Sequence, residues 1–193
     1  MLDLNNHTVI LASGSPRRHR FLKEMGIPFE VRLKSLDEIY PPELKGSEIS
    51  DYLAKLKADA FEGELQNREI LITSDTVVWH NGVSLAKAAD AEEAFQMLRA
   101  LSGDWHEVIT SVCFSTQVEQ QVKNQTTQVK FRQLLDEEIK YYVNTYKPYD
   151  KAGAYGIQEW IGLTGIEEIK GSYPNVVGLP TQLVYKTLIE MAK

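Results

Sequence analysis

The chain has 193 residues, a length that suits one domain or two small lobes. It carries 21 basic against 27 acidic residues, and its formal net charge of −6 argues against a general nucleic-acid-binding surface, which requires a basic face. This net charge does not exclude a small basic pocket. Hydrophobic residues make up 43% of the chain, which is enough to build a core.

The single cysteine, Cys113, excludes an internal disulfide and a cysteine metal cluster, and it is typical of a reducing, cytoplasmic setting. Cys113 stands in a strand-like run and is expected to be a small core residue. The first six residues lack the basic start and apolar segment of a signal peptide, and no apolar run is long enough to span a membrane. We therefore expect a cytoplasmic protein without a membrane or nucleic-acid partner.

The N-terminal part predicts a strand, a tight turn and a helix. An apolar run over residues 7–12 precedes Ser13-Gly14-Ser15, and Pro16 suits the first helical position with Ser15 as its N-cap. The helix should end near Gly26. Three arginines in the first turn, at positions 17, 18 and 20, oppose the helix dipole, which fits a phosphate-binding site. A capped surface helix with solvated arginines is the equally good alternative.

The next part predicts a strand over residues 29–33, an acidic loop and a helix from Ser47 to about Leu65. The loop holds Asp37 and Glu38, and from the residues alone a solvated acidic loop is favoured. Lysines 55 and 57 fall outside the apolar stripe of the helix. One of them could face a cleft, although two solvated lysines are the commoner arrangement.

The most strand-like segment, from Ile70 to Trp79, is apolar almost throughout and is expected to be central in the sheet. Ser74, Asp75 and Thr76 interrupt it. Because an isolated buried charge is unfavourable, the pattern favours Asp75 as a metal ligand or general base over a structural carboxylate. The Asn-Gly pair at 81–82 predicts a hairpin that returns to Lys87, near the Asp75 end, as a point charge for phosphate.

The following segments alternate between helices and strands. A helix from Asp90 to about Leu101 opens on a capping box, and a second one over 137–145 is expected to be capped by Asp136. Between them, strands over 105–118 and 126–131 flank a polar stretch, 119–125, which predicts a hairpin tip. His106 is expected to be a hydrogen-bonded structural residue.

Two loops near the C-terminus are rich in glycine. The first, 150–158, combines small residues with charge, and this favours the wall of a site. A strand over 164–169 and a second loop, 171–180, lead into a last helix that begins at Pro180-Thr181. The whole pattern predicts an α/β fold with a mixed sheet and flanking helices, with polar loops at the strand ends where a cleft would form.

Seven motifs now identify a family that the chain resembles across nearly its whole length. They are LASGSPRR at 11–18, LKADAF at 56–61, SDTVV at 74–78, LAK at 85–87, LSGDWHEVIT at 101–110, DKAGAYGIQ at 150–158 and GSYPNVVGLP at 171–180. In this order they resemble the Maf family of nucleoside triphosphate pyrophosphatases, relatives of inosine triphosphate pyrophosphatase. The resemblance implies one Maf-like domain over 1–193, with two lobes around a central cleft. It also implies hydrolysis of a nucleoside triphosphate to the monophosphate and pyrophosphate with a divalent cation, Mg²⁺ or Mn²⁺.

The resemblance also assigns roles residue by residue. Asp75 matches the catalytic carboxylate and, with Glu38, the region of the metal. The expected substrate-binding residues are Ser13, Arg17, Arg18, Lys57, Thr76, Lys87 and Gln158. Arg17, Thr76 and Gln158 match the branch that acts on dTTP and UTP, and modified pyrimidine nucleotides are compatible with the same positions. The Gln158 amide suits a pyrimidine imide edge because it can both donate and accept hydrogen bonds.

Several alternatives stay open at this point. Asp75 can act as base or as metal ligand. The chain can be a nucleotide-binding regulator of cell division without catalysis, or it can perform the same chemistry on 7-methyl-GTP or ITP. Two departures from the family pattern, Ser74 before the aspartate and Ala86 and Ala88 on either side of Lys87, remove no charged group. The oligomeric state is also open, a homodimer included.

Overall fold

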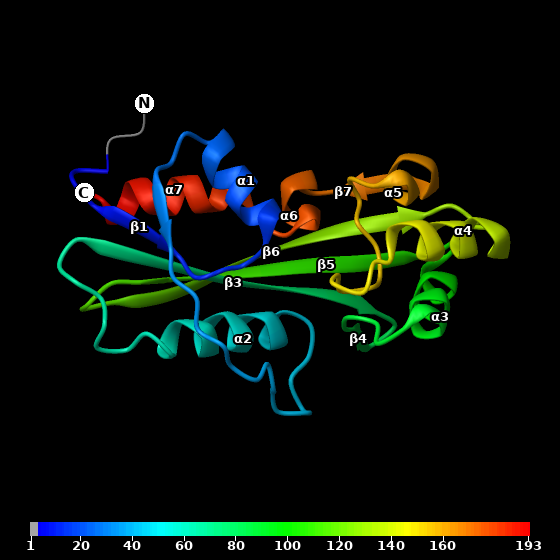
Figure 1. The fold of residues 1–193 in the computed structure, drawn as a ribbon, viewed down its shortest axis with the longest axis horizontal. Coiled ribbons are helices and arrows are strands. Elements are labelled where there is room, and N and C mark those ends of the chain that lie inside the picture. Colours follow the sequence, from blue (N-terminus) through cyan, green and yellow to red (C-terminus); the bar gives the residue numbers. More distant parts are fainter. Residues whose placement is uncertain (1–3) are drawn as a thin grey trace. The chain divides into compact units, whose positions relative to one another are not determined.

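A computed structural model describes residues 4–193 of the chain. Its strands are β1 (Thr8–Leu11), β2 (Phe29–Val31), β3 (Glu69–His80), β4 (Val83–Leu85), β5 (Trp105–Ser115), β6 (Gln120–Phe131) and β7 (Ile166–Lys170). Its helices are α1 (Pro16–Glu24), α2 (Ser47–Asp59), α3 (Ala91–Leu101), α4 (Asp136–Tyr146), α5 (Trp160–Gly165), α6 (Tyr173–Val177) and α7 (Thr181–Met191) (Figure 1). None of the helices within 4–193 combines the length and apolar character that crossing a membrane requires. The expectation about a signal peptide concerns residues 1–6, of which 1–3 lie outside the described residues.

The strands form one mixed sheet with the order β2-β1-β3-β5-β6-β7, and β4 pairs with β3. β1 runs parallel to both β2 and β3, whereas β4 is antiparallel to β3 and β7 is antiparallel to β6. The predicted fold class, α/β with a mixed sheet and flanking helices, is thereby confirmed. The predicted hairpin is also confirmed, since Asn81 and Gly82 both have positive φ, as a type I′ turn requires.

The chain divides into two compact units. The first unit contains the residues up to Asp75, together with 110–125 and 178–193. Within it, α1 and α7 lie on one face of the strands and α2 lies on the other (Figure 1). Side chains alternate between these faces with the strand period of two: Ile70 and Ile72 pack with α1 and α7, and Leu71 packs with α2. This alternation fixes which way the polar residues that follow Ile72 point.

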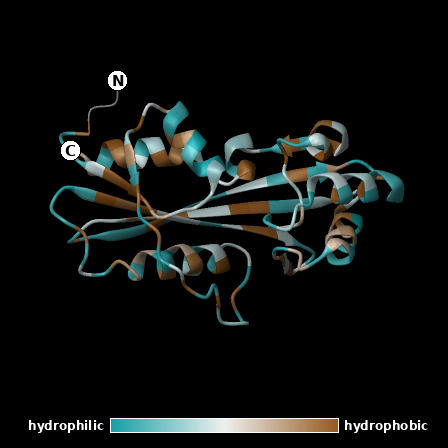
Figure 2. Ribbon diagram, viewed as in Figure 1, coloured by the Kyte–Doolittle hydropathy of each residue, from teal (hydrophilic) through white to brown (hydrophobic). Residues whose placement is uncertain are grey.

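The second unit contains residues 76–109 and 126–177. A single apolar cluster joins its strand segments to α3, α4 and α5, and Figure 2 shows hydrophobic residues along α3. His106 lies in this cluster, where its Nε2 is 2.6 Å from the Tyr155 hydroxyl. The expected structural role of His106 is thus confirmed, and so is the burial of Cys113 in the first unit.

Two predicted boundaries in the first unit are wrong. The helix predicted to reach Leu65 ends at Asp59, and turns follow in which Gly63 takes φ +77°, a conformation no helix can include. The predicted hairpin tip, 119–125, instead belongs almost wholly to β6. Its polar side chains find partners there, since Lys123 Nζ lies 3.1 Å from the Thr187 hydroxyl and Asn124 donates to the Asp51 carboxylate at 3.0 Å. Tertiary hydrogen bonds outweigh the turn-like polarity of this stretch.

Two details are also wrong in the second unit. Asp136 is the first residue of α4 rather than its cap, and its carboxylate pairs with Arg99 at 3.2 Å. The carboxylate that satisfies the helix start is Glu138, which accepts from the Leu135 N–H at 2.9 Å. The strand predicted from Thr164 begins at Ile166, because Thr164 and Gly165 belong to the short helix α5, whose six residues give too little periodicity to be recognised.

Candidate active site

The turn between β1 and α1 is organised by the Ser13 side chain. Ser13 is buried, and its Oγ accepts hydrogen bonds from the Ser15 N–H and from Arg18 Nη1, both at 3.2 Å. His19 Nε2 lies 2.5 Å from the Ser13 carbonyl oxygen. Ser15 occupies the N-cap position, but its hydroxyl makes no capping bond, so the prediction of a Ser15 side-chain cap is wrong. The hydroxyl two residues earlier holds the turn instead.

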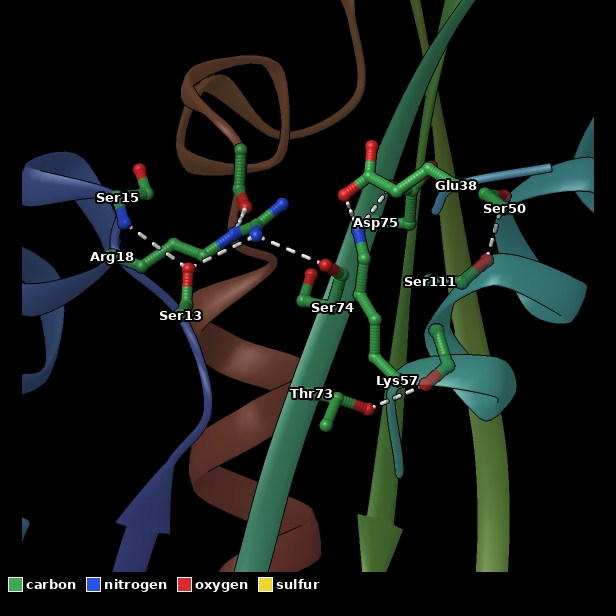
Figure 3. A network of polar contacts seen from close by, with 12 residues as sticks. Ser13, Ser15, Arg18, Glu38, Ser50, Lys57, Thr73, Ser74, Asp75 and Ser111 are labelled. Carbon is green, nitrogen blue, oxygen red and sulfur yellow. Dashed lines mark hydrogen bonds and ion pairs between the residues drawn. The ribbon is translucent and has the colours of Figure 1, made fainter. Parts of the chain in front are cut away.

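Arg18 connects this turn to two other segments of the first unit (Figure 3). Its Nη1 donates to the Ser74 carbonyl at 3.0 Å, and its Nε donates to the Gly178 carbonyl at 2.9 Å. Burial lowers the pKa of the guanidinium, and the neighbouring Arg17 charge lowers it further, whereas the Asp75 carboxylate raises it. Since an arginine keeps its proton in proteins, Arg18 supplies a fixed positive charge. Solvated arginines, the alternative derived from sequence, therefore do not describe Arg18.

Lys57 reaches the site because α2 is fastened to β3. The Thr73 hydroxyl donates to the Ala54 carbonyl at 2.6 Å, one turn before Lys57. Lys57 Nζ then lies 2.7 Å from Asp75 Oδ1 and 2.7 Å from Glu38 Oε1 (Figure 3). The expectation of two solvated lysines is thus wrong for Lys57 and correct for Lys55, which pairs on the surface with Asp59 at 2.8 Å.

Asp75 is almost fully buried, with 8% of its surface exposed. Burial raises the pKa of its carboxyl group, and this effect outweighs Lys57 and Arg18, which lower the pKa; the nearby Glu38 charge raises it further. A raised pKa makes a carboxylate a better proton acceptor. The arrangement is therefore compatible with the predicted role of Asp75 as a base.

Glu38 comes from the acidic loop before α2, and its side chain is 42% exposed. Its ion pair with Lys57 draws it to the same ammonium as Asp75, so the loop is more than a solvated acidic segment. Two carboxylates beside one another suit Mg²⁺, which often takes only one or two carboxylates from a protein and the rest from water and substrate phosphates. Within residues 4–193, no group of three or more potential metal-ligating side chains occurs. Asp75 and Glu38 thus fit a metal that is shared with a substrate.

Three predicted substrate-binding residues belong to the second unit. Thr76 follows Asp75 directly in β3 and is half-buried. Lys87 is exposed, and its backbone bridges to Ala152. Gln158 is half-buried. The placement of Lys87 near Asp75 and the site wall over 150–158 stay predictions.

The close backbone approach expected in this loop is confirmed at Gly153. Its φ is +66°, and a Cβ there would lie 3.0 Å from both methyl groups of Val78. Glycine is therefore needed at this position both for its conformation and for lack of space.

Sequence reasoning missed the groups that hold the charged side chains in place. These are the carbonyl oxygens of Ala54, Ser74 and Gly178 and the hydroxyl of Thr73. A carbonyl group is present in every residue and carries no signature in a sequence. Two sequence signals lay close to them: the polar interruption of β3 that contains Ser74, and the segment 171–180, predicted as a loop, which contains Gly178 although its residues 173–177 form α6.

The first unit thus brings together Ser13, Arg18, Glu38, Lys57 and Asp75. Fixed cations beside a buried carboxylate can bind a polyanion, neutralise charge that develops on it, and accept a proton from water.

Comparison with known proteins agrees with this chemistry. A dTTP/UTP pyrophosphatase of Flavobacterium psychrophilum is 58% identical over 184 residues, covering 95% of this chain and 94% of that protein. One from Flavobacterium johnsoniae is 56% identical over 185 residues (96% and 95%), and one from Bacteroides fragilis is 45% identical over 192 residues (99% and 100%). Among solved structures, the Staphylococcus aureus Ham1 protein has a TM-score of 0.44 and 14% identity, covering 64% of this chain and 71% of that one. The sequence profile described as Maf-like protein matches residues 8–191. The chain therefore belongs to the family of Maf-like proteins.

Proposed function

We propose that this protein hydrolyses nucleoside triphosphates, dTTP and UTP in particular, to the monophosphate and pyrophosphate in a reaction that depends on a divalent metal. The observation that carries the proposal is the cluster in which Lys57 lies 2.7 Å from both Asp75 and Glu38. Support for the substrates comes from the relatives named dTTP/UTP pyrophosphatase, which are 45–58% identical to this chain. Modified pyrimidine nucleotides fit the same proposal.

The cationic side chains bind the triphosphate. Arg18 supplies a fixed positive charge for the phosphates, because its guanidinium is held by Ser13 and by the carbonyl groups of Ser74 and Gly178. Arg17, Lys57 and Lys87 add positive charge, and Ser13 orients the turn. These groups stabilise negative charge that moves onto the leaving pyrophosphate, and they need no rearrangement of solvent to do so.

Asp75 and Glu38 would hold the metal. A divalent cation there would supply a lowered pKa for its bound water and neutralise phosphate charge. Lys57, which pairs with both carboxylates in the structure, turns to the phosphates when the substrate is bound.

Asp75 accepts the proton of the water that attacks the α-phosphorus atom. The bond between this phosphorus and the bridging oxygen to the β-phosphorus breaks, and the electron pair leaves with pyrophosphate. The burial that raises the pKa of Asp75 favours proton acceptance. Gln158 contacts the imide edge of the pyrimidine, and Arg17 and Thr76 complete the preference for dTTP and UTP.

The deciding experiment incubates the purified protein with Mg²⁺ and, separately, Mn²⁺ against dTTP, UTP, 7-methyl-GTP and ITP, and measures pyrophosphate separately from orthophosphate. We expect pyrophosphate from dTTP and UTP, and loss of the reaction when the metal is chelated. Pyrophosphate mainly from 7-methyl-GTP or ITP would overturn the substrate assignment and keep the mechanism. Nucleotide binding without any product would favour a regulator instead.

A further inference from the structure

The segment that follows α4 in the second unit is held by a compact polar cluster of Tyr142, Lys151 and Glu159. The Tyr142 hydroxyl donates to Glu159 Oε2 and accepts the Gly156 N–H at 3.0 Å. Lys151 Nζ lies 3.1 Å from Glu159 Oε1 and 2.7 Å from Asp150 Oδ1. The Tyr142 side chain is fully buried, and those of Lys151 and Glu159 are only 10% and 19% exposed. A cluster so enclosed holds its members in one arrangement.

The backbone around Gln158 is fixed on both sides. The Glu159 N–H donates to the Gly156 carbonyl at 2.9 Å, which closes a tight turn with Gln158 inside it. Glu159 is also the N-cap residue of α5, and its carbonyl accepts the Gly162 N–H at 3.0 Å. Gln158 thus stands between two residues whose positions are set by the Tyr142 hydroxyl.

The Gln158 side chain, in contrast, is left available. It is half-buried, yet its amide makes no hydrogen bond to any of residues 4–193. Its polar atoms are not among the fully buried atoms without a partner in these residues, so the amide is open to solvent or to a ligand. The ordered backbone therefore presents an amide whose hydrogen-bonding groups the protein leaves open to a ligand.

Glu159 and the Gln158 amide share the space above Gly156. A Cβ on Gly156 would lie 2.8 Å from Glu159 Cδ and 2.9 Å from Gln158 Nε2. Gln158 Nε2 and the Glu159 carboxyl carbon thus both lie within 2.9 Å of one point beside Gly156, and a carboxylate attracts an NH₂ group and repels a carbonyl oxygen. This electrostatic preference favours an amide whose Oε1, the acceptor, is directed away from Glu159.

The orientation matters because a glutamine that rotates freely about its last bond can pair with different base edges. Thymine and uracil present an N3–H donor, whereas cytosine presents N3 as an acceptor. A fixed Oε1 accepts a hydrogen bond from the N3–H of thymine or uracil and repels N3 of cytosine.

We propose that Glu159, held by Tyr142 and Lys151, is a positioning residue that selects thymine and uracil by orienting the Gln158 amide. This inference rests on the proposed function, in which Gln158 contacts the base.

The test compares E159Q and Y142F with wild type for dTTP, UTP and CTP, measuring kcat and KM by pyrophosphate release at saturating metal. E159Q keeps the size of the side chain and removes its charge, and Y142F removes the hydroxyl. For E159Q we expect kcat/KM for dTTP and the ratio of dTTP to CTP each to fall by about tenfold, through KM, with kcat changed by less than about twofold. Y142F should act in the same direction.

The matched control is E138Q. Glu138 lies in the same unit and forms a comparable charged pair, with Oε1 2.7 Å from Arg132 Nη2 and Oε2 3.0 Å from Arg132 Nη1. E138Q should lower stability and leave the ratio of dTTP to CTP unchanged. An E159Q protein that is folded and retains the wild-type ratio overturns the inference, as does an equal loss of kcat for all three nucleotides.

Binding of dTMP and dCMP to wild type and E159Q, measured by calorimetry, separates this inference from the proposed function. If wild type releases no pyrophosphate but prefers dTMP, and E159Q loses that preference, the reaction is wrong and the positioning role of Glu159 is supported. If wild type releases pyrophosphate, and the ratio of dTMP affinity to dCMP affinity is the same in wild type and E159Q, the positioning role is wrong and the reaction stands.

Discussion

Asp75 combines a negative charge with an almost fully buried position, and Lys57 offsets only part of the unfavourable free energy of burial. Its pKa is raised in the folded protein relative to an ordinary value of 3.8. The stability that this residue contributes is therefore present below its unfolded pKa and lost as the pH rises through the folded pKa. The burial that suits Asp75 for proton acceptance therefore lowers the stability of the fold at pH values above the pKa of Asp75.

We expect D75N to lose about a thousandfold in turnover, the contribution of a general base, and to be at least as stable as wild type near about pH 7. The difference in melting temperature in favour of D75N should shrink as the pH falls through the raised folded pKa of Asp75 toward the ordinary value of 3.8. Pyrophosphate release and melting curves across this pH range check both parts. A variant with full turnover at saturating metal would remove Asp75 from the mechanism.

Replacing Lys57 tests how much the ion pair between Lys57 and Asp75 contributes to stability. K57M leaves the buried Asp75 carboxylate without its closest cation, and we expect a loss of about 3 kcal/mol in the free energy of unfolding. The control is K55M on the same helix, whose pair with Asp59 is exposed and should contribute less than about 1 kcal/mol. Urea unfolding of both variants decides the matter, and equal losses would contradict the burial argument.

We expect His106 to make the stability of the protein sensitive to acid. Burial, and to a lesser degree the charge of His80, lowers the pKa of His106 to about 3, from an ordinary 6.5. Because this pKa is depressed in the folded state, the neutral imidazole stabilises the fold above about pH 6.5, and the stabilisation is lost as the pH falls toward the folded pKa.

In H106Q, which cannot take up this proton, stability should fall less between about pH 7 and about pH 4, by roughly 3 kcal/mol. Urea unfolding at the two pH values measures the difference. Parallel losses in H106Q and wild type would assign the acid sensitivity to other groups.

At the level of elements, the loop over 150–158 is seated on β3 through Gly153. Replacing Gly153 by alanine brings a methyl group within 3.0 Å of Val78 and also strains a residue with φ +66°. Gly63 offers a matched control, because its φ of +77° is similar but no atom lies within 4 Å of the added methyl group. We expect G153A to lose roughly 1–3 kcal/mol more stability than G63A, as measured by thermal unfolding. Similar losses would mean that only backbone conformation matters at Gly153.

Elements were predictable where local signals agreed with packing. The strand, turn and helix around Ser13 to Pro16 and the Asn81-Gly82 hairpin follow from turn chemistry and periodicity alone. The polar start of β6 was not predictable, because Lys123 and Asn124 are held by partners far away in the sequence. The same reason limits how much of the site could be predicted. The sequence pointed to Asp75 as a functional residue. Its distance to Lys57, however, depends on the hydrogen bond between Thr73 and Ala54, which has no sequence signal.

At the scale of the whole molecule, neither unit is a continuous piece of chain. Each of β3, β5 and β6 supplies residues to both units. Unfolding of one unit therefore disrupts strands that also belong to the other, and we expect a single cooperative transition.

The distribution of tryptophan allows a direct check. All three tryptophans, Trp79, Trp105 and Trp160, belong to the second unit, so their fluorescence reports on that unit alone. Far-ultraviolet circular dichroism reports on the helices of both units. The two urea curves should coincide, and a fluorescence midpoint that differs from the dichroism midpoint would show that the units unfold separately.

The way Arg18 is held has a consequence for mutational scanning. Two of its acceptors, at Ser74 and Gly178, are main-chain carbonyl groups, which no side-chain replacement removes. An alanine at position 74 keeps the carbonyl and deletes a buried hydroxyl that has no hydrogen-bond partner within residues 4–193, so it will score as neutral. Any replacement of Gly178, at φ +120°, will score as harmful because of backbone strain. A scan would thus register neither position as a support for the guanidinium, although both determine where it points.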